Sequence, residues 1–355
     1  MTHVTDEPIR WGILATGKIA HTFADDLLLV PDATLVAVGS RRLEAAQAFA
    51  AAYDAPQKAQ QPDAPSIKAY GSYEEFVADP DIDVVYIASP HGLHLEHATL
   101  AFEAGKHVLS EKAITLTVAD AETMVARARE HDRFLMEAMW TACHPAIHTL
   151  RARLSSGEFG RPRQLHAELG FRVDDGPESR MLDPRLGAGA LLDMGIYPLT
   201  FAHLLLGEAL DLRAVGDVRT TPHGSFDMDV AMVGRYAGGA VSTMAASMSS
   251  WSSRAAGIAT DLGRIEIPDF HHPSHITFTP YGGPDDDPDR GRPVPIEAEA
   301  PVIGLGYGNE IAEVDRCLRA GLRESPLVPH AQTLALMRQM EDVLTQLGVD
   351  YTTVG

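Results

Sequence analysis

From Ile9 to about Met139 the chain alternates short apolar runs with segments whose apolar residues recur at helical spacing. Between the first two runs, Ile19, Phe23 and Leu27 recur every four residues and would place one apolar stripe of a helix against a sheet. Strands that alternate with helices are typical of βαβ units and a parallel sheet. We therefore expect an α/β domain with strands at Ile9–Leu14, Thr34–Val38, Val84–Ala88, His107–Leu109 and Phe134–Met139.

The pattern changes after Thr141. The segment Gln164–Val173 alternates apolar and polar residues, as a half-buried strand does. Further short strands are expected at Leu212–Val218, Val230–Tyr236, Val241–Met248, Ile265–Ile267 and Ile276–Phe278. Helices are expected at Pro145–Leu154, Ala188–Leu206, Glu310–Ala320 and Ala331–Leu347. The stretch Gly282–Pro295, rich in Pro, Gly and Asp, predicts an exposed loop.

The length of 355 residues exceeds what one hydrophobic core usually serves, so we expect two domains. The change of pattern divides them into residues 1–141 and 142–355. The first is expected to be an α/β domain with a parallel sheet. The second is expected to be an α+β domain with an open, mostly antiparallel sheet.

The formal net charge of −20 restricts the partners of the chain. Nucleic-acid binding draws most of its affinity from Lys and Arg, and anionic membrane surfaces repel an acidic protein, so we expect neither partner. Cys143 and Cys317 are too few for a disulfide framework and lack metal-ligand spacing, which favours reduced thiols. The N-terminus carries no apolar run of signal-peptide type, and no run of about 18 uninterrupted apolar residues occurs, so the sequence predicts a cytoplasmic protein.

The first expected strand ends in a turn that opens a helix. This turn reads Ala15-Thr16-Gly17-Lys18-Ile19-Ala20, an A-x-G-x-x-A pattern with alanine where the usual dinucleotide fingerprint begins with glycine. Dinucleotide-binding folds place the pyrophosphate here, on backbone N–H groups at the helix N-terminus. Small residues at such a turn also serve for close packing, so the turn indicates a cofactor only in its βαβ context.

The second expected strand ends in Gly39-Ser40-Arg41-Arg42. A fold that prefers NAD usually has an acid here, which accepts hydrogen bonds from the ribose 2′-OH. A hydroxyl and two guanidinium groups suit a 2′-phosphate instead, because the guanidinium group of Arg can donate two charge-assisted hydrogen bonds to phosphate oxygens. We therefore expect NADP in preference to NAD. In the alternative, Arg41 and Arg42 begin a solvated helix and Glu44 is the neighbouring acid.

Two further strands end in Ser89-Pro90-His91 and in Ser110-Glu111-Lys112. In an open parallel sheet the ligand lies at the carboxyl ends of the strands, so Lys112 is delivered to the place where a nicotinamide would bind. By itself, a Glu-Lys pair is more often a surface ion pair.

Taken jointly and in order, these motifs resemble the glucose-fructose oxidoreductase and inositol dehydrogenase (Gfo/Idh/MocA) family, and within it the branch of dihydrodiol dehydrogenases and NADP-linked xylose dehydrogenases. The matching segments are GILATGKIA, VYIASPHGLH, GKHVLSEKA, FLMEAMWT, GALLDMGIYP and SPLVPHAQTLALMRQMEDV, which span nearly the whole chain. The resemblance implies a Rossmann dinucleotide-binding domain followed by an open-faced antiparallel sheet. It also implies a sugar-like or cyclic-diol substrate held between the domains, and a homodimer or homotetramer formed through the exposed sheet.

The resemblance further implies site residues. The family's Glu-Lys motif supplies an active-site lysine, carried here onto Lys112, and its D-x-x-x-H/Y motif supplies Asp193 and the acid/base Tyr197. A spacing of four puts the last two on one face of a helix. Expected cofactor contacts are Ala15, Thr16, Gly17, Lys18, Ile19, Ser40, Arg41, Arg42, Ser89, Pro90, His94, Glu111 and Lys112.

A tyrosine with an ordinary pKa of about 10 is a poor base unless a nearby cation favours the phenolate. We therefore expect Lys112 to polarise the reacting oxygen and to lower the pKa of Tyr197, which exchanges the proton, while Asp193 orients Lys112 or the substrate. In the alternative, Asp193 caps backbone groups and Tyr197 packs in the core.

The sequence departs from the family pattern at two places. The family's Glu-Lys-Pro is Glu111-Lys112-Ala113 here, so any role of the proline in fixing the lysine backbone, including a cis bond, is expected to be lost or replaced. Ala142 and Cys143 stand where the related branch often has Arg and Phe, which indicates a different or larger substrate. The expected substrate contacts are Trp140, Cys143, Arg172 and Arg180.

Two groups of histidines could in principle bind a metal ion, but the spacing of the histidines along the sequence does not favour a metal site. Residues that are three apart on a helix are not directly in line, so His91, His94 and His97 would be spread across the helix surface. In addition, His91 precedes the expected helix start. His94 is expected near the nicotinamide or substrate, and His97 at the surface or in packing. The His271, His272 and His275 loop has no carboxylate or Cys spacing to complete a site, so we expect no metal.

These observations favour a hydride-transferring oxidoreductase that uses NADP(H). Two alternatives remain open. One is a glycoside-cleaving enzyme in which bound dinucleotide is oxidised and reduced within one cycle. The other is a non-catalytic sugar sensor on the same fold, which would be expected to lack the lysine or the acid/base, whereas Lys112 and Tyr197 are both present.

Overall fold

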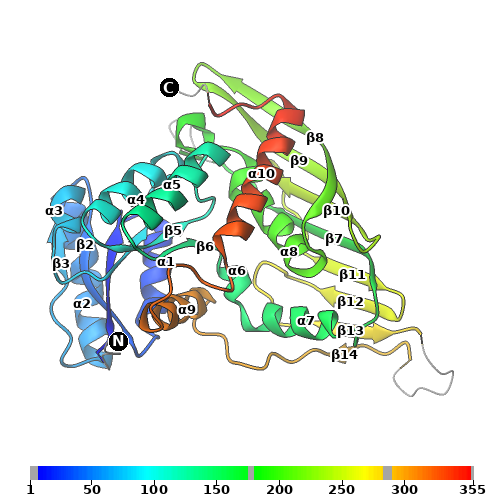
Figure 1. Cartoon of the computed structure of the whole chain (residues 1–355), viewed down its shortest axis with the longest axis horizontal. Helices are drawn as coiled ribbons and strands as arrows, with labels where there is room; N and C mark the ends of the chain where they lie inside the picture. The colour runs from blue at the N-terminus through cyan, green and yellow to red at the C-terminus, as the bar shows by residue number, and fades with distance from the viewer. Residues whose placement is uncertain (1–6, 175–179, 283–289, 353–355) are drawn as a thin grey trace. The chain divides into compact units, whose positions relative to one another are not determined.

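The computed structural model describes residues 7–174, 180–282 and 290–352. It divides into two compact units (Figure 1). The first unit contains Met1–Cys143 and Val302–Thr333, and the second contains His144–Pro301 and Leu334–Gly355. The segment 302–333 thus packs with the first unit, whereas the division expected from the sequence pattern placed it with the second.

The first unit is built on a parallel sheet in the order β3-β2-β1-β4-β5-β6. This is the strand order of a Rossmann fold, and the predicted α/β class is confirmed. Every residue of β2 is buried, as expected of a strand covered on both faces. The five predicted strands are present, whereas the sequence pattern missed β3. The strands are β1 Ile9–Leu14, β2 Ala33–Gly39, β3 Lys68–Tyr70, β4 Val84–Ile87, β5 His107–Glu111 and β6 Leu135–Ala138.

Two helices of the first unit, α3 and α5, begin at side-chain caps. Ser72 accepts a hydrogen bond from the Glu75 backbone N–H, and Thr117 accepts one from that of Asp120. Such caps satisfy N–H groups that have no partner inside the helix. The helices of this unit are α1 Lys18–Leu27, α2 Leu43–Gln60, α3 Tyr73–Val77, α4 His94–Glu103, α5 Val118–Glu130, α6 Trp140–Cys143 and α9 Tyr307–Arg319.

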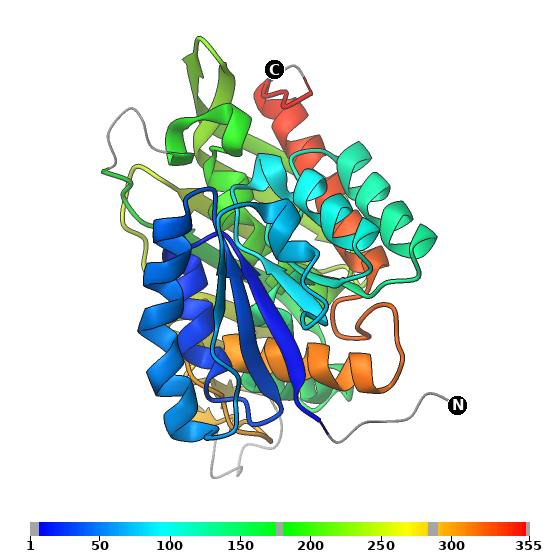
Figure 2. The same ribbon diagram turned by 90° about the vertical axis from the view of Figure 1, so that its left-hand side faces the viewer.

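Two buried acids hold the late segment 302–333 in the first unit. Asp315, on α9, accepts a hydrogen bond from Trp11 Nε1 of β1 at 3.0 Å. Asp26, on α1, accepts from the backbone N–H groups of Leu305 and Gly308. Helix α9 packs against α1 and α6, and Figure 2 shows it in orange close to the blue helices. The Trp11 bond joins residues that are 304 positions apart, and the Leu305 bond joins residues 279 positions apart.

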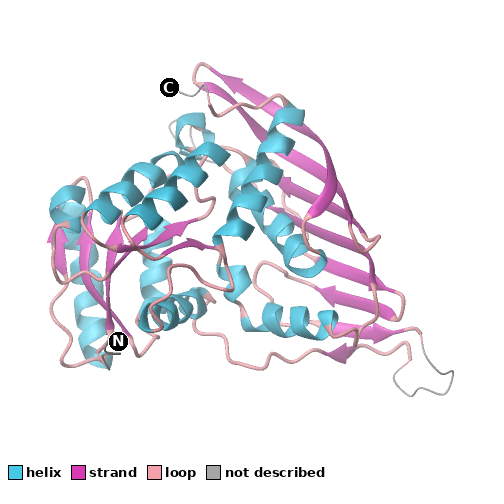
Figure 3. Ribbon diagram, viewed as in Figure 1, coloured by secondary structure: helices cyan, strands magenta, loops and turns pink. Residues whose placement is uncertain are grey.

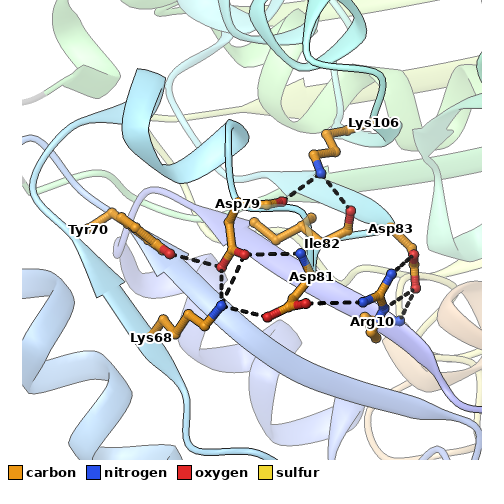
Figure 4. Close-up of polar contacts among 8 residues, drawn as sticks. All are labelled: Arg10, Lys68, Tyr70, Asp79, Asp81, Ile82, Asp83 and Lys106. Carbon is orange, nitrogen blue, oxygen red and sulfur yellow. Dashed lines mark hydrogen bonds and ion pairs between the residues drawn. The ribbon is translucent and has the colours of Figure 1, made fainter.

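A network of charged groups lies at the amino ends of the strands of this sheet (Figure 4). Lys68 Nζ binds both oxygens of Asp79 at 3.0 and 3.1 Å and an oxygen of Asp81 at 2.6 Å. Buried Lys106 donates to the backbone oxygens of Asp79 and Ile82 at 2.6 and 2.9 Å. Cofactors bind at the opposite, carboxyl ends of parallel strands, so this network is structural.

The second unit is built on a mixed sheet in the order β14-β13-β12-β11-β7-β10-β9-β8. Among the described strands, β7 and β10 pair in parallel and the other neighbours pair antiparallel, which confirms the predicted sheet type. The sequence pattern missed β11. The strands are β7 Pro162–Gly170, β8 Ala209–Thr221, β9 Gly224–Tyr236, β10 Val241–Ser247, β11 Ala256–Thr260, β12 Gly263–Ile267, β13 Thr277–Pro280 and β14 Val294–Pro295.

The loop predicted at Gly282–Pro295 is only partly observable. Residues 283–289 lie outside the described residues, and the end of the predicted loop is wrong, because β14 pairs there with β13. Backbone pairing along the edge of a sheet needs no apolar pattern, so the sequence did not predict this exposed two-residue strand.

Helices cover one face of the second sheet, and no described helix lies on the other face (Figure 3). The helices are α7 Pro145–Ser155, α8 Ile196–Leu206 and α10 His330–Leu347. Helix α8 packs against β7 and β10, and the end of α10 is bound to β8 through Gln346 Nε2 and the Leu212 backbone oxygen at 2.9 Å. Val215, Val233 and Val241 are exposed on the strands.

The stretch Pro184–Leu206 is long and apolar enough to count as a candidate membrane span, and 78% of its most apolar window is buried in the structure. A buried helix of a protein core passes the same test of length and composition.

Candidate active site

The turn after β1 presents backbone groups in the way a dinucleotide requires. Gly17 is the N-cap of α1, and a Cβ added there would meet no described atom within 4 Å. Ala15 has a φ of 79°, the left-handed conformation that glycine adopts without steric cost, and its N–H donates to the Gly39 oxygen at 2.9 Å. The first amides of a helix have no intrahelical partner, so the open N-terminus of α1 is suited to bind an anion.

The end of β2 supplies the positive charges. Ser40 is buried, and its Oγ accepts a hydrogen bond from the Arg42 N–H at 3.5 Å, while the side chains of Arg41 and Arg42 are exposed. Burial and, to a smaller extent, the Arg41 charge lower the pKa of His97 to about 4. The guanidinium of Arg41 therefore lies within electrostatic reach of His97.

His94 contacts the backbone of two loops at the carboxyl ends of the strands. Its side chain is fully buried, and each ring nitrogen faces backbone carbonyls. Nε2 lies 2.8 Å from the Ser89 oxygen, and Nδ1 lies 3.1 and 3.2 Å from the Ala113 and Ile114 oxygens. Burial lowers the pKa of His94 to about 4. The ring therefore links the loops after β4 and β5, and the expectation that His94 lies near the nicotinamide or substrate stays a prediction.

The neighbouring His97 is a packing residue. His97 is buried, its Nδ1 lies 2.8 Å from Ser89 Oγ, and its ring meets that of Tyr73 edge-on at 4.8 Å. Burial raises the pKa of Tyr73, and the Arg41 charge lowers it. The described residues contain no group of three or more His, Cys, Asp or Glu side chains that could hold a metal ion.

Lys112 follows directly after β5 and is half-buried. The preceding Glu111 is buried, accepts a hydrogen bond from Tyr86 Oη and accepts another from the Lys112 N–H at 3.2 Å. The peptide bond between Lys112 and Ala113 is cis. A cis bond at this position is therefore present without the proline of the family motif.

Asp193 and Tyr197 lie in the second unit on a helix that starts irregularly. A continuous α-helix was predicted over Ala188–Leu206, but residues Leu191–Gly195 form a π-helix that runs into α8. Single π turns inside helices often mark functional sites. Tyr197 is 4% exposed, and its ring meets the ring of His271 edge-on at 4.4 Å between centroids.

Sequence reasoning missed Asp227, which fixes this irregular turn from β9. Its Oδ2 accepts a hydrogen bond from the Leu191 N–H at 2.7 Å, in a fully buried position. Gly189, with a φ of 128°, leaves room for this carboxyl, because a Cβ there would lie 2.6 Å from Asp227 Oδ1. Burial raises the pKa of Asp227 to about 6. A buried acid far along the chain has no local sequence signal.

The four expected substrate contacts lie in different surroundings. Trp140 and Cys143 are buried in the first unit, where the Trp140 ring stacks on that of Tyr307 at 5.6 Å. In the second unit Arg172 and Arg180 are exposed, and Arg172 pairs with Asp174 at 2.5 Å. Burial raises the pKa of the Cys143 thiol well above its ordinary value, so this group is no ready nucleophile.

Comparison with known proteins matches both units to one family. Residues 9–139 match the oxidoreductase family with an NAD-binding Rossmann fold, and residues 147–267 match the GFO/IDH/MocA C-terminal domain. The chain belongs to the GFO/IDH/MocA oxidoreductase family. The resemblance inferred from the motifs is thereby confirmed, and so is the two-part fold class.

Members of the GFO/IDH/MocA family resemble this chain along its whole length. A trans-1,2-dihydrobenzene-1,2-diol dehydrogenase of Mus musculus is 33% identical over 355 residues, covering 97% of this chain and 98% of the relative. A D-xylose 1-dehydrogenase (NADP(+)) of Hypocrea jecorina is 33% identical over 382 residues, covering 97% and 93%. These relatives are dehydrogenases, and this chain is an enzyme of the oxidoreductase class.

Solved structures of lower identity share the fold. An aldose-aldose oxidoreductase from Caulobacter crescentus, complexed with glycerol, has a TM-score of 0.81 at 22% identity, covering 96% of this chain and 97% of that one. A 3-ketoreductase from Actinomadura kijaniata, in complex with NADP and TDP-benzene, has a TM-score of 0.78 at 23% identity, covering 96% and 98%.

Proposed function

We propose that this enzyme transfers a hydride between NADP(H) and a CH–OH or carbonyl carbon of a sugar, polyol or cyclic diol, and that it works in the cytoplasm. The names of its relatives support the substrate class, because one acts on a dihydrobenzenediol and another on xylose. The single observation that carries the cofactor preference is the exposed guanidinium pair Arg41 and Arg42 after β2.

The residues of the first unit fit a dinucleotide. The open backbone at Gly17 lets a pyrophosphate approach the N-terminus of α1 without meeting a side chain. Arg41 and Arg42 reach into solvent at the end of β2, where a 2′-phosphate would be held by charge-assisted hydrogen bonds. NADP(H), when bound, supplies or accepts the hydride, and the protein supplies position and charge.

We assign three side chains to the reaction. Lys112 polarises the oxygen on the reacting carbon, because a fixed cation stabilises negative charge that develops there. Tyr197 exchanges the proton of that oxygen, and Asp193 orients the reacting groups. Burial of the Tyr197 ring and its contact with His271 hold the phenol in one orientation, as a proton-transfer group requires.

We further propose that the enzyme is a homodimer or homotetramer formed through the open face of the second sheet. Val215 is 73% exposed, Val233 is 53% exposed and Val241 is 45% exposed on neighbouring strands. Apolar groups gathered on one sheet face favour association with a second copy. Light scattering of the eluting enzyme measures the assembly, and Val215→Lys with Val233→Lys should yield monomers.

The activity is tested with a panel of aldoses, polyols, inositols, anhydrosugars and cyclic diols, followed by reduced-nicotinamide absorbance with each cofactor. Net NADPH formation is expected with at least one compound. Cleavage of a glycoside without net NADPH formation would identify the redox-neutral alternative instead.

Lys112→Met should abolish steady-state turnover, leaving only a slow residual rate that single-turnover measurements detect, and should leave dinucleotide binding nearly intact, since Lys112 is assigned to the reacting oxygen and not to the phosphates. Fluorescence titration with NADP⁺ measures the binding. Lys58→Met, on the surface of α2, is the matched control and should keep normal rates. A Lys112→Met enzyme with a near-normal rate would refute the assignment.

A further inference from the structure

Glu137 is a buried carboxyl of the first unit to which the proposed function gives no role. It lies on β6 and is 2% exposed. Its Oε1 accepts a hydrogen bond from the Ile114 N–H at 3.1 Å, and its Oε2 accepts one from Thr333 Oγ1 at 2.9 Å. A buried carboxyl is costly unless its oxygens are hydrogen-bonded, and here both are. Glu137 therefore binds the segment that follows Lys112 to the first turn of α10.

Other buried side chains hold the same segment. The Lys112 N–H donates to Glu111 Oε2 at 3.2 Å, and the Ala113 and Ile114 oxygens face His94 Nδ1. Ala113 and Ile114 are themselves buried. The main chain is thus fixed on both sides of Lys112, while the Lys112 side chain is only half-buried.

The charges of this region also reach Glu137. The pKa of Glu137 is raised to about 7, chiefly by burial and also by the Glu111 charge, against the hydrogen bonds from Thr333 and Ile114 and the Lys112 charge, which lower it. The ammonium of Lys112 therefore lies within electrostatic reach of Glu137.

We propose that Glu137 is a positioning residue for Lys112, acting by accepting the Ile114 N–H and so fixing the backbone from which Lys112 projects. The proposal rests on the proposed role of Lys112 at the reacting oxygen. Lys112 has a long side chain with several rotatable bonds, so its ammonium is only as well placed as its Cα. A misplacement of about 1 Å can lower an enzymatic rate by about 10²-fold.

Two substitutions separate the hydrogen bond from the charge. Glu137→Gln keeps an oxygen for the Ile114 N–H and places an amide against Thr333 Oγ1, so kcat should stay within about threefold of the normal value. Glu137→Met keeps the length of the side chain but removes the acceptor, so kcat should fall about 10- to 100-fold while the Kd for NADP⁺ changes less than about twofold. Thr333→Val is the matched control, because it removes the other partner of Glu137 and leaves the Ile114 bond.

A double-mutant cycle with Lys112→Met, measured in single turnovers at high enzyme concentration, shows whether Glu137 acts through Lys112. If it does, Glu137→Met adds no further loss of rate once Lys112 is gone. An equal loss in both backgrounds overturns the proposal, and so does a folded Glu137→Met enzyme with a normal rate.

Should Glu137→Met fail to fold, Glu137→Asp replaces it, because the shorter side chain keeps the charge and withdraws the carboxyl from Ile114. The same loss of kcat is expected, and a normal rate overturns the proposal. Failure of the proposed function is a different result, since Lys112→Met would then retain activity by itself.

Discussion

Replacing Asp315 by asparagine should stabilise the enzyme near neutral pH and flatten the pH dependence of its stability. Asp315 is 3% exposed, and its Oδ1 accepts the Trp11 N–H, whereas Oδ2 has no hydrogen-bond partner among the described residues. Burial raises the pKa of Asp315 from 3.8 to about 8, although the Trp11 bond and the Arg319 charge lower it. Asparagine keeps an acceptor for Trp11, and its amide has no proton to lose in this pH range, so no charge becomes buried.

The sign and size follow from the two pKa values. The folded state binds a proton that the unfolded state has released between pH 3.8 and about 8, so stability is full below this window and falls as pH rises through it. Each unit of pH inside the window removes about 1.4 kcal/mol, which amounts to roughly 4 kcal/mol at pH 7. Asp315→Asn should recover up to that amount at pH 7 and almost nothing at pH 4.

Urea unfolding at a series of pH values, followed by tryptophan fluorescence, measures the difference between the two proteins. Asp63→Asn, at an exposed acid in the loop after α2, serves as the control and should change stability by less than about 0.5 kcal/mol throughout. A constant difference between Asp315→Asn and the normal enzyme across the pH range would refute the reasoning, because it would show that no proton is taken up at Asp315 on folding.

The remaining predictions concern the proposed chemistry. Arg41→Ala should lower kcat/KM with NADP⁺ about 10- to 100-fold, the worth of one or two charge-assisted hydrogen bonds, and leave NAD⁺ kinetics nearly unchanged; an equal loss with both cofactors in steady-state assays would contradict the phosphate role. Tyr197→Phe should keep the packed ring and the melting temperature but lower kcat about 10²- to 10⁴-fold, and the rise of the oxidation rate with pH should disappear. Retention of that rise would assign the proton to another group.

The sequence predicted the first sheet well because buried parallel strands are continuous apolar runs. The predicted strand Ile9–Leu14 coincides with β1, and β2, β4 and β6 differ from the predictions only at their ends. Strand β3 escaped because it is a three-residue edge strand with no fully buried position. Edge strands gain their stability from backbone pairing, which leaves no apolar signal.

The sequence predicted where the motif residue Lys112 lies in the sheet, but not the side chains that hold the backbone around it. Lys112 lies at the carboxyl end of β5 as expected, since that position follows from sheet topology alone. The partners that hold its backbone cannot be predicted from local sequence, because they come from other elements of the fold. His94 contacts residues 113 and 114, and Glu137 contacts Thr333. The π turn before Tyr197 was missed for the same reason, since the Asp227 carboxyl that receives the Leu191 N–H comes from β9.

The return of residues 302–333 to the first unit affects how this protein can be made and divided. During synthesis β1 and α1 leave the ribosome long before α9 does. Trp11 and Asp26 therefore cannot form their hydrogen bonds to Asp315 and Leu305 until residues His144–Pro301 have also been synthesised. A fragment cut after Cys143 would contain the cofactor fingerprint but would leave those groups uncovered. An isolated or transplanted nucleotide-binding module from this enzyme would therefore have to carry α9 with it, joined by a new connection that replaces His144–Pro301.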